Sequence, residues 1–331
     1  MRERYDNLDG MRAYASIGII LMHIIANGDY CLSGFIFNKI IPSFTNFTYL
    51  FMIISAFSMC CGYYDRFSSG KVDLEKFYLR RYKRIWPYFA VLCTFELIVD
   101  HSLNSLYEWF ADITLAFGFI PDHNISVVGV GWFLGVIFIF YMVFPFFVFL
   151  LKNRKRAWIT FFVCVALNAL CNIRFEEAIG RSNFIYSAMF FSAGGLLYLY
   201  RNQLNKIGLG IFSLLMLLVV TIAYYLLNSS DYVTLCLFVL LSIILISYGG
   251  VTIHAIFYNK AIRFLAGISM EMYLCHMFVF RIIEKLKLLH ITNNEIINYC
   301  ITSVATICGA IVFSIVLKKV IDIVSKKYRK S

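Results

Sequence analysis

The sequence predicts an all-α protein that crosses a membrane many times. Of its 331 residues, 61% are hydrophobic and 15% are charged, whereas a soluble domain is about half apolar and about a quarter charged. Apolar stretches of about twenty residues, the length at which a helix spans a bilayer, recur along the whole chain. The first of them is not followed by a small-residue cleavage site, so we expect a retained helix and no cleaved signal peptide.

Ten stretches are expected to span the membrane, within a single integral membrane domain over residues 1–331. They are 10–27, 43–61, 85–100, 128–151, 157–172, 183–200, 207–227, 231–250, 264–284 and 296–317. One further apolar segment, "LYEWFADITLAFGFI" at 106–120, is shorter and contains Glu108 and Asp112. If this segment also spans, every later loop changes sides.

The distribution of Lys and Arg favours ten spans. With ten spans and a cytoplasmic N-terminus, 24 of the 30 basic residues lie on the cytoplasmic side, as the positive-inside rule requires. An eleventh span would place "KNRKR" at 152–156 and the C-terminal tail outside. We therefore expect both termini in the cytoplasm and 106–120 as a re-entrant or interfacial segment on the outer side. Irregular backbone at membrane depth is tolerated only against protein or a water-filled cavity, so this segment is predicted to line one.

The net charge of +11 and the ten cysteines have simple interpretations in a membrane protein. Positive-inside loops explain the charge without a nucleic-acid partner. The cysteines show no CxxC motif and no Cys/His ligand spacing, and most lie in apolar stretches, where cysteine behaves as a small apolar residue. We expect no bound metal, no disulfide framework and no nucleic-acid binding.

Arg12 and His23, the two ends of "RAYASIGIILMH", are predicted to share one face of the first helix. Eleven residues correspond to about three turns plus ~20° of rotation, with ~16 Å between the two positions along the axis. Arg12 would then lie at the inner membrane surface and His23 near the middle of the bilayer. Ionisable groups at such depth usually mark a functional site, although a neutral histidine hydrogen-bonded to another helix is also compatible with the pattern.

A basic cluster precedes the third predicted span, in "FYLRRYKRIWP". It contains four cations, of which three are arginines: Arg80, Arg81, Lys83 and Arg84. Arg81 and Arg84 are three residues apart and face the same way on a helix, whereas Lys83 points largely elsewhere. The positive-inside rule explains this cluster, and so does bidentate recognition of phosphate at the mouth of the bundle.

Three polar side chains interrupt a late span, in "GISMEMYLCHMFV": Glu271, Tyr273 and His276. His276 lies about twelve residues from the inner end of the span, at a depth similar to that of His23, and Glu271 lies nearer the cytoplasm. A structural hydrogen bond between helices is the favoured interpretation of this group.

These motifs, in this order, resemble those of the acyltransferase 3 family of integral membrane acyltransferases. "LDGMRAYASIGIILMH" resembles a first helix with an arginine, ten residues and a histidine, and "FYLRRYKRIWP" matches an Arg-x-x-Arg element at Arg81 and Arg84. "FTYLFMIISAFSM", "GWFLGVIFIFYMVFP" and "GISMEMYLCHMFV" resemble three further helices of the family. The resemblance covers essentially the whole chain.

The sequence departs from the family pattern at two places. Many relatives carry a Glu-Glu pair after the tryptophan motif, where this chain has Ile137 and Phe138, so we expect no carboxylate role on that helix. The glycine of the family's Ser-Gly-Phe turn is Ala56. The extracytoplasmic esterase-like domain that some relatives use to complete the transfer is not expected here.

The resemblance implies transfer of an acyl group, usually acetyl, from cytoplasmic acyl-coenzyme A to a sugar hydroxyl of a cell-surface polysaccharide or its lipid-linked precursor. The expected location is a bacterial plasma membrane. Arg12, Arg81 and Arg84 would hold the phosphates of the acetyl-coenzyme A donor. His23 would act as the catalytic base or would itself carry the acyl group, and both mechanisms remain open.

Further candidates on the late helix are Glu271, Tyr273 and His276. Three residues of the outer loops are weaker candidates for contacts to the acceptor, and ordinary solvated positions explain them better: His101, Asp122 and His123. The main alternative function is a transporter or flippase for a surface polysaccharide or lipid. It does not explain why a histidine and an arginine share a helix face beside phosphate-binding arginines, and the paired broken helices of many transporters are not evident. A non-catalytic sensor has no positive support.

Overall fold

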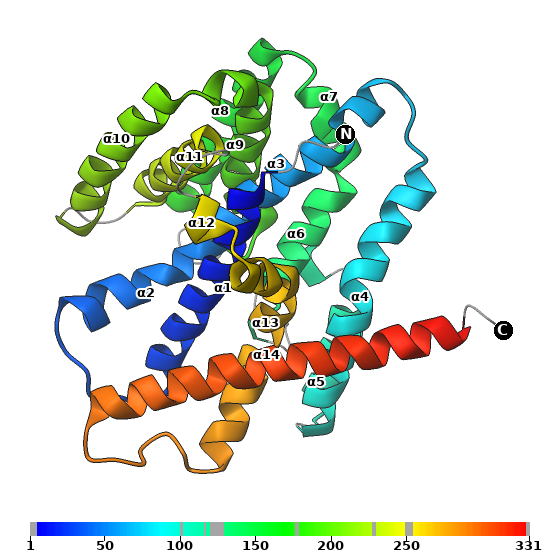
Figure 1. Cartoon of the computed structure of the whole chain (residues 1–331). Coiled ribbons are helices and arrows are strands. Elements are labelled where there is room, and N and C mark those ends of the chain that lie inside the picture. The colour runs from blue at the N-terminus through cyan, green and yellow to red at the C-terminus, as the bar shows by residue number, and fades with distance from the viewer. Residues whose placement is uncertain are drawn as a thin grey trace.

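The computed structural model describes residues 5–99, 102–115, 117–119, 129–175, 179–226, 230–248 and 254–328. Within these ranges the chain is helical and contains no β-strand, which confirms the predicted all-α fold (Figure 1). The helices are α1 (Asp6–Asn27), η1 (Ile36–Ile40), α2 (Ile41–Ser43), η2 (Phe44–Asn46), α3 (Phe47–Ser68), α4 (Leu74–Val99), α5 (Leu103–Ile113), η3 (Phe117–Phe119), α6 (Trp132–Met142), α7 (Phe144–Leu150), α8 (Arg154–Arg174), α9 (Phe184–Leu204), α10 (Ile207–Leu226), α11 (Asp231–Ser247), α12 (His254–Phe257), α13 (Lys260–Lys285) and α14 (Glu295–Tyr328).

Every predicted span overlaps a described helix, and the span expected at 128–151 overlaps the bent pair α6 and α7. Among the described residues, six helices are long and apolar enough to cross a membrane, and the bent pair would make a seventh. The six cover Asp6–Asn27, Ile36–Ser68, Arg154–Arg174, Ile207–Leu226, Lys260–Lys285 and Glu295–Lys326. The number ten and the cytoplasmic placement of both termini therefore stay predictions.

Polar side chains fix the first turn of several helices. Ser102, Asn153, Asn183, Ser230 and Asn259 each accept a hydrogen bond from a backbone N–H two or three residues later. Such caps satisfy N–H groups that have no partner within the helix. These residues therefore set the points at which α5, α8, α9, α11 and α13 begin.

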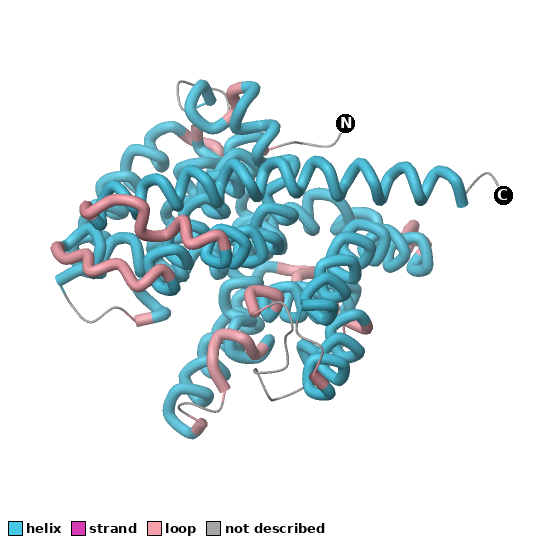
Figure 2. Tube along the Cα trace, turned by 90° about the horizontal axis from the view of Figure 1, so that it is seen from below, coloured by secondary structure: helices cyan, strands magenta, loops and turns pink. Residues whose placement is uncertain are grey.

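Helices α1, α3 and α13 lie at the centre of the bundle, and α8 and α10 lie at its edge (Figure 1). Inside the protein, 56% of the apolar part of α1 and 61% of that of α13 are buried, against 17% in α8 and 11% in α10. An apolar helix with so much exposed surface needs lipid around it, because water would not solvate it. The longest described helix, α14, packs against α13, α1 and α4, and its C-terminal end projects beyond the bundle (Figures 1 and 2).

Helix α9 packs directly on α3 at a glycine. A Cβ atom at Gly194 would lie 2.2 Å from the carbonyl oxygen of Ile53, so only glycine allows this approach of the two backbones. Beside this contact the rings of Tyr49 and Phe190 stack with centroids 3.8 Å apart. The close approach holds α3 in the position from which it contributes side chains to the site described below.

The segment 106–120 does not form a membrane-crossing helix in its described part. Helix α5 has 11 residues, which is a length of about 16 Å against a hydrocarbon core of about 30 Å. It packs on α4, where the Trp109 indole donates to the Thr94 hydroxyl at 3.1 Å and the Trp86 indole donates to a carbonyl at the end of α5 at 2.8 Å. Phe117 is buried against Gly135 of α6. One face of α5 and the Phe117 ring thus lie against protein, whereas Leu106, Tyr107, Phe110 and Phe119 are exposed. The location of the segment on the outer side stays a prediction.

The axes of α6 and α7 differ by 60°. Pro145 causes the bend, because it has no N–H and its ring clashes with the carbonyl four residues earlier, that of Tyr141. At the bend the Tyr78 hydroxyl donates to the carbonyl oxygen of Met142 at 2.8 Å. The last turn of α6 is thereby tied to α4, and this contact places Tyr141 beside the arginines of α4.

Candidate active site

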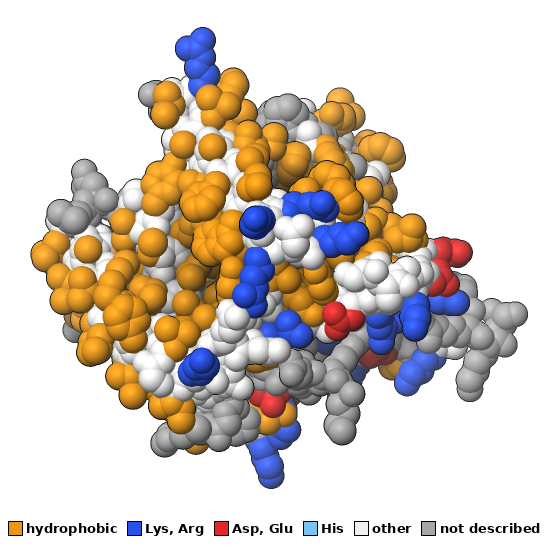
Figure 3. Space-filling model, turned by 90° about the horizontal axis from the view of Figure 1, so that it is seen from above, with side chains coloured by type: hydrophobic (Ala, Val, Ile, Leu, Met, Phe, Trp, Pro, Cys, Tyr) orange, Lys and Arg blue, Asp and Glu red, His pale blue; other side chains and the backbone are white. Residues whose placement is uncertain are grey.

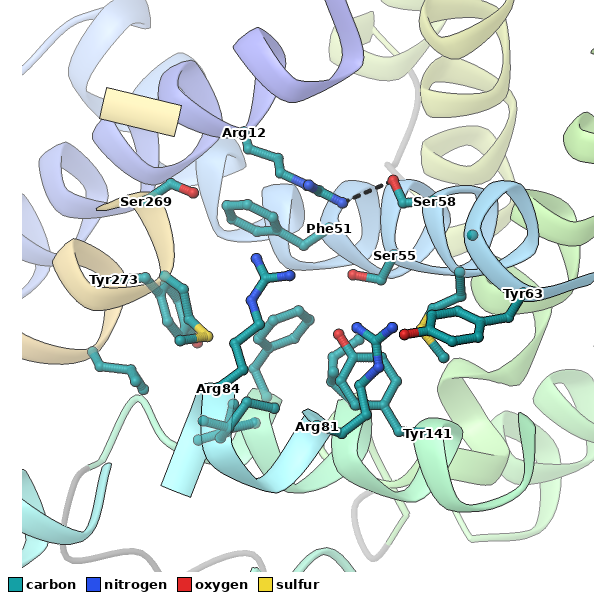
Figure 4. Close-up of a pocket in the computed structure, with 18 residues that line it drawn as sticks. Arg12, Phe51, Ser55, Ser58, Tyr63, Arg81, Arg84, Tyr141, Ser269 and Tyr273 are labelled. Carbon is teal, nitrogen blue, oxygen red and sulfur yellow. Dashed lines mark hydrogen bonds between the residues drawn. The ribbon is translucent and has the colours of Figure 1, made fainter. Parts of the chain in front are cut away.

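Basic side chains gather at the end of the bundle where the N-terminus lies. In the view onto this end, several of them lie near the middle of the face with hydrophobic side chains above and to the left, and others lie toward its margins (Figure 3). A cavity of about 240 Å³ lies between α1, α3, α4, α6 and α13 (Figure 4). The residues that line it define the arginine cavity: Arg12, Phe51, Ser55, Ser58, Met59, Gly62, Tyr63, Arg81, Arg84, Ile85, Phe133, Leu134, Ile137, Tyr141, Ser269, Met270, Tyr273 and Leu274.

Three arginines converge in the arginine cavity, Arg12 from α1 and Arg81 and Arg84 from α4 (Figure 4). The structure thus brings together the three residues that the sequence assigned to phosphate binding. No Asp or Glu is among the described residues that line the cavity. Arg12 and Arg81 are partly buried and Arg84 is exposed. Three cations gathered in one cavity are suited to an anionic ligand.

Arg12 is held in place by two side chains. Its guanidinium donates to the Asp9 carboxylate at 2.8 Å, one turn earlier on α1, and to the Ser58 hydroxyl of α3 at 3.0 Å. It also lies 3.5 Å from the carbonyl oxygen of Ile54. A guanidinium has five N–H donors, so donors remain for a ligand after these three contacts. Asp9 and Ser58 therefore orient Arg12 without using up its capacity for hydrogen bonds.

Arg81 is surrounded by aromatic rings. Its guanidinium carbon lies 4.9 Å from the ring centroid of Tyr63, 5.3 Å from that of Tyr141 and 5.6 Å from that of Phe77. The ring faces stabilise the cation, but its buried Nε atom has no hydrogen-bond partner among the described residues. A buried donor without an acceptor is costly, and a bound anion would supply the acceptor.

Arg84 lies close enough to Arg12 for the two charges to repel each other. In the described part of the chain, no hydrogen bond or ion pair holds the Arg84 guanidinium, which distinguishes it from Arg12. Two like charges in one cavity, of which one has no partner, are stabilised when an anion lies between them. The pair is therefore arranged for a ligand with more than one negative oxygen.

Asp73, in the loop before α4, contacts the first turn of the helix that carries these arginines. The Asp73 carboxylate accepts a hydrogen bond from the backbone N–H of Lys76 at 3.0 Å and lies 2.9 Å from its ammonium group. These contacts hold the pKa of the Asp73 carboxyl below its ordinary value. Asp73 thus caps α4 in the charged state.

His23 of α1 and His276 of α13 lie side by side, with ring centroids 5.1 Å apart. The His276 side chain is fully buried, and its Nδ1 lies 2.7 Å from the carbonyl oxygen of Tyr273. A carbonyl can only accept, so Nδ1 carries the proton and Nε2 has the lone pair. Nε2 has no partner among the described residues. His23 and His276 are called the histidine pair below.

The histidine pair does not line the arginine cavity, but Tyr273 connects the two. Tyr273 belongs to the cavity wall, and its ring centroid lies 6.1 Å from that of His276, one turn further along α13. The Tyr273 hydroxyl donates to the carbonyl oxygen of Val130 at 2.7 Å. A ligand that reached from the arginines to the histidines would therefore pass beside Tyr273.

A family model described as an acyltransferase domain matches residues 5–315, which is nearly the whole chain. The chain belongs to the acyltransferase 3 family. Neither the curated proteins nor the solved structures compared with it include a match. Acyl transfer in a membrane is thus the general activity of this protein family, and the arginine cavity and the histidine pair of this acyltransferase are candidates for its site.

The two positions at which this acyltransferase departs from the Glu-Glu pattern lie on α6. Ile137 lines the arginine cavity, and Phe138 packs edge-to-face against Tyr82 with centroids 4.9 Å apart. An apolar side chain at position 137 leaves the cluster of arginines without a carboxylate on that wall. The cavity of this acyltransferase is correspondingly more cationic than it would be with a glutamate there.

Glu271 does not join the arginine cavity. Its carboxylate pairs with Lys318 of α14 at 3.0 Å, so the sequence-based interpretation as an interhelix contact fits Glu271. The Tyr273 hydroxyl instead reaches a backbone carbonyl of the turn before α6, that of Val130. The outer-loop candidates His101, Asp122 and His123 lie outside the described residues.

Several residues of the site were not found from the sequence. Ser58, Tyr63 and Tyr141 contact Arg12 or Arg81, but a serine or tyrosine in an apolar helix gives no sign of which partner it meets. Arg181, before α9, lies within electrostatic range of His23 and stacks over the Trp132 ring at 5.5 Å. In the sequence, Arg181 stood out as a basic residue on the expected outer side, where the positive-inside rule predicts few.

Proposed function

We propose that this acyltransferase transfers an acetyl or related acyl group from cytoplasmic acyl-coenzyme A to a hydroxyl of a cell-surface polysaccharide or its lipid-linked precursor. The proposed location is a bacterial plasma membrane. The observation that carries the proposal is the arginine cavity, in which Arg12, Arg81 and Arg84 converge without a described carboxylate in the lining. Tyr273 lies between this cavity and the histidine pair. The histidine pair adds groups that are capable of proton transfer.

Acyl-coenzyme A matches the chemistry of this cavity. It is a phosphorylated nucleotide with a long, thin arm that ends in a thioester. Arginine binds phosphate oxygens through two parallel hydrogen bonds, which lysine cannot do. The free donors of Arg12 and the unpartnered Nε of Arg81 are available for this contact. The arm would then extend beside Tyr273 toward the histidine pair.

His276 is proposed to orient His23. The two ring centroids lie 5.1 Å apart, and Nε2 of His276 has no partner among the described residues, so a turn of the His23 ring toward it would be needed to form a hydrogen bond. Because Nε2 of His276 holds a lone pair, it can accept the N–H of His23. The second nitrogen of His23 is then left with a lone pair, as a general base requires.

The proposed reaction is direct transfer. His23 accepts the proton of the acceptor hydroxyl while the hydroxyl oxygen attacks the thioester carbonyl carbon. The C–O bond forms, the C–S bond breaks, and the coenzyme A thiolate leaves and takes up the proton. The products are the acyl ester and the free thiol, so atoms and charges balance. A covalent acyl-histidine would instead appear as labelled protein when acceptor is withheld.

The deciding experiment measures binding of acetyl-coenzyme A to the purified protein in lipid nanodiscs. We expect micromolar or tighter binding that coenzyme A itself competes for, followed by thiol release when a polysaccharide acceptor is added. A transporter or flippase would move its lipid-linked substrate without binding the donor or releasing thiol. Absence of donor binding by folded protein would therefore refute the proposal and favour that alternative.

A further inference from the structure

A second cavity adjoins the arginine cavity. It has a volume of about 350 Å³ and lies between α4, α13 and α14. Arg84, Ser269 and Met270 line both cavities, so the two lie side by side. Its charged lining residues besides Arg84 are Lys83, Glu271, Lys318 and Asp322.

Lys318 is the organised cation of the second cavity. Its ammonium group donates to the Glu271 carboxylate at 3.0 Å and to the Gly267 carbonyl oxygen at 3.3 Å. Glu271 is buried, whereas 45% of the Lys318 side chain is exposed. An ammonium group has three N–H donors, so one donor remains for a ligand after these two contacts.

The charges of the second cavity favour an anion. Lys318 neutralises Glu271, which leaves Lys83 and Arg84 against the exposed carboxylate of Asp322. The helical position of Lys83 predicted that its side chain points away from Arg81. In the structure Lys83 lines the second cavity and not the arginine cavity. Compact ammonium groups suit a phosphate monoester, which carries close to two negative charges at neutral pH and three strong acceptor oxygens.

Resting on the proposed function, we propose that the second cavity binds the ribose phosphate monoester of the coenzyme A nucleotide, through Lys318 and Lys83. The donor carries phosphates at two separate places, a diphosphate in the arm and a monoester on the ribose. Two cationic sites that share Arg84 match this division. The diphosphate lies at the arginine cavity, and the nucleotide end lies between α4 and α14.

The test compares two donors that differ only in the monoester, acetyl-coenzyme A and 3′-dephospho-acetyl-coenzyme A. Their affinities are measured by calorimetry on the full chain in nanodiscs of neutral lipid. Wild-type protein is expected to bind acetyl-coenzyme A about tenfold or more tightly than the dephospho donor, since a charge-assisted contact to phosphate is lost with the monoester. Lys318→Ala and Lys83→Ala are expected to weaken binding of acetyl-coenzyme A alone, and Lys319→Ala, at an exposed neighbouring position, is the matched control.

Removal of Lys318 leaves Glu271 buried and unpaired, so the fold needs its own control. The double variant Lys318→Ala/Glu271→Gln removes both charges, and Lys318→Arg keeps the cation. The proposal requires that the double variant no longer distinguishes the two donors and that Lys318→Arg still does. Thermal unfolding of each variant identifies loss of structure, and Lys83→Ala tests the same cavity without breaking an ion pair.

The outcomes separate this proposal from the proposed function. Wild-type protein that binds both donors equally, or a Lys318→Ala variant that weakens both equally, overturns the second site while donor binding stands. Binding of neither donor overturns both proposals. A third outcome is that the protein in nanodiscs with anionic phospholipid binds that lipid through Lys318 and Lys83, while the alanine variants of both lysines keep the wild-type affinity for the donor. The cavity then binds a lipid headgroup and the proposal is wrong.

Discussion

The imidazole rings of His23 and His276, which are 253 positions apart in the chain, lie with centroids 5.1 Å apart where α1 and α13 meet. Only one ring nitrogen of His276 is occupied, by the Tyr273 carbonyl. The His276 side chain is fully buried, and its other nitrogen has no hydrogen-bond partner among the described residues, although the His23 ring lies beside it. Substitutions of His23 and of His276 can therefore test the role of each residue separately.

His23→Ala is expected to abolish acyl transfer and to leave donor binding nearly unchanged. A general base contributes about 10²- to 10⁴-fold to a rate, and the alanine variant loses the base without touching the arginine cavity. The measurement is the rate of coenzyme A release, followed with a colorimetric thiol assay. His290→Ala, which removes an exposed histidine paired with Glu295 at 3.3 Å, should behave as wild type. Wild-type turnover in the His23 variant would remove it from the mechanism.

His276→Gln is expected to lower kcat less than His23→Ala does, with an unchanged KM for the donor. The glutamine side-chain oxygen can replace Nε2 as an acceptor, but its flexible chain holds His23 less firmly. His276→Phe fills the same space without an acceptor and should lose more activity. If both variants lost only thermal stability and retained kcat, His276 would be a packing residue.

Arg81→Ala and Arg84→Ala should each weaken binding of acetyl-coenzyme A. A charge-assisted hydrogen bond contributes about 1.5–3 kcal/mol, which corresponds to a roughly ten- to hundredfold change in affinity. Arg84→Lys keeps the charge but loses the planar fork, and a measurable loss in that variant would support phosphate recognition. Arg80→Ala is the control, because Arg80 is exposed and lines neither cavity. Unchanged binding in both alanine variants would show that the arginine cluster serves as a topology signal and does not bind the donor.

Residues 101–127 are expected outside the cell and residues 152–156 inside. Single cysteines at Asn104 and Lys155, both exposed, should therefore react with a membrane-impermeant maleimide from opposite sides. Ser105 is unsuitable for this purpose, because it is buried beneath the start of α5. Four native cysteines are exposed and must be replaced first: Cys31, Cys236, Cys300 and Cys308. Labelling of both sites from the same side would refute the ten-span topology.

Gly194→Ala should destabilise the protein, because its Cβ would lie 2.2 Å from the Ile53 carbonyl oxygen and force α9 away from α3. Overpacking of this kind costs about 1–3 kcal/mol, measured as a lower midpoint of thermal unfolding in detergent. Gly208→Ala adds the same methyl group to α10, where nothing lies within 4 Å. Equal midpoints for the two variants would show that α9 and α3 adjust without cost.

The sequence by itself determined the helices, the multi-pass class, the family resemblance and the shared faces along single helices. These features depend on local periodicity, so Arg81 and Arg84 were expected on one side of α4 and they line one cavity. Of the three polar residues of the late span, Glu271 makes the contact between helices that the sequence favoured, with Lys318 of α14. Tyr273 instead reaches the turn before α6, and His276 bonds to a carbonyl of its own helix.

Only the tertiary structure decided which helix faces meet. Nothing in the spacing of Tyr141 or Ser58 shows that they contact Arg81 and Arg12, because helices that are apolar all round give no pattern that selects their neighbours. The pairing of His23 with His276, and of Glu271 with Lys318, depends likewise on the packing of α1, α13 and α14. Helical periodicity is a property of one segment, whereas a site built from five helices is a property of how loops and close backbone contacts bring those segments together.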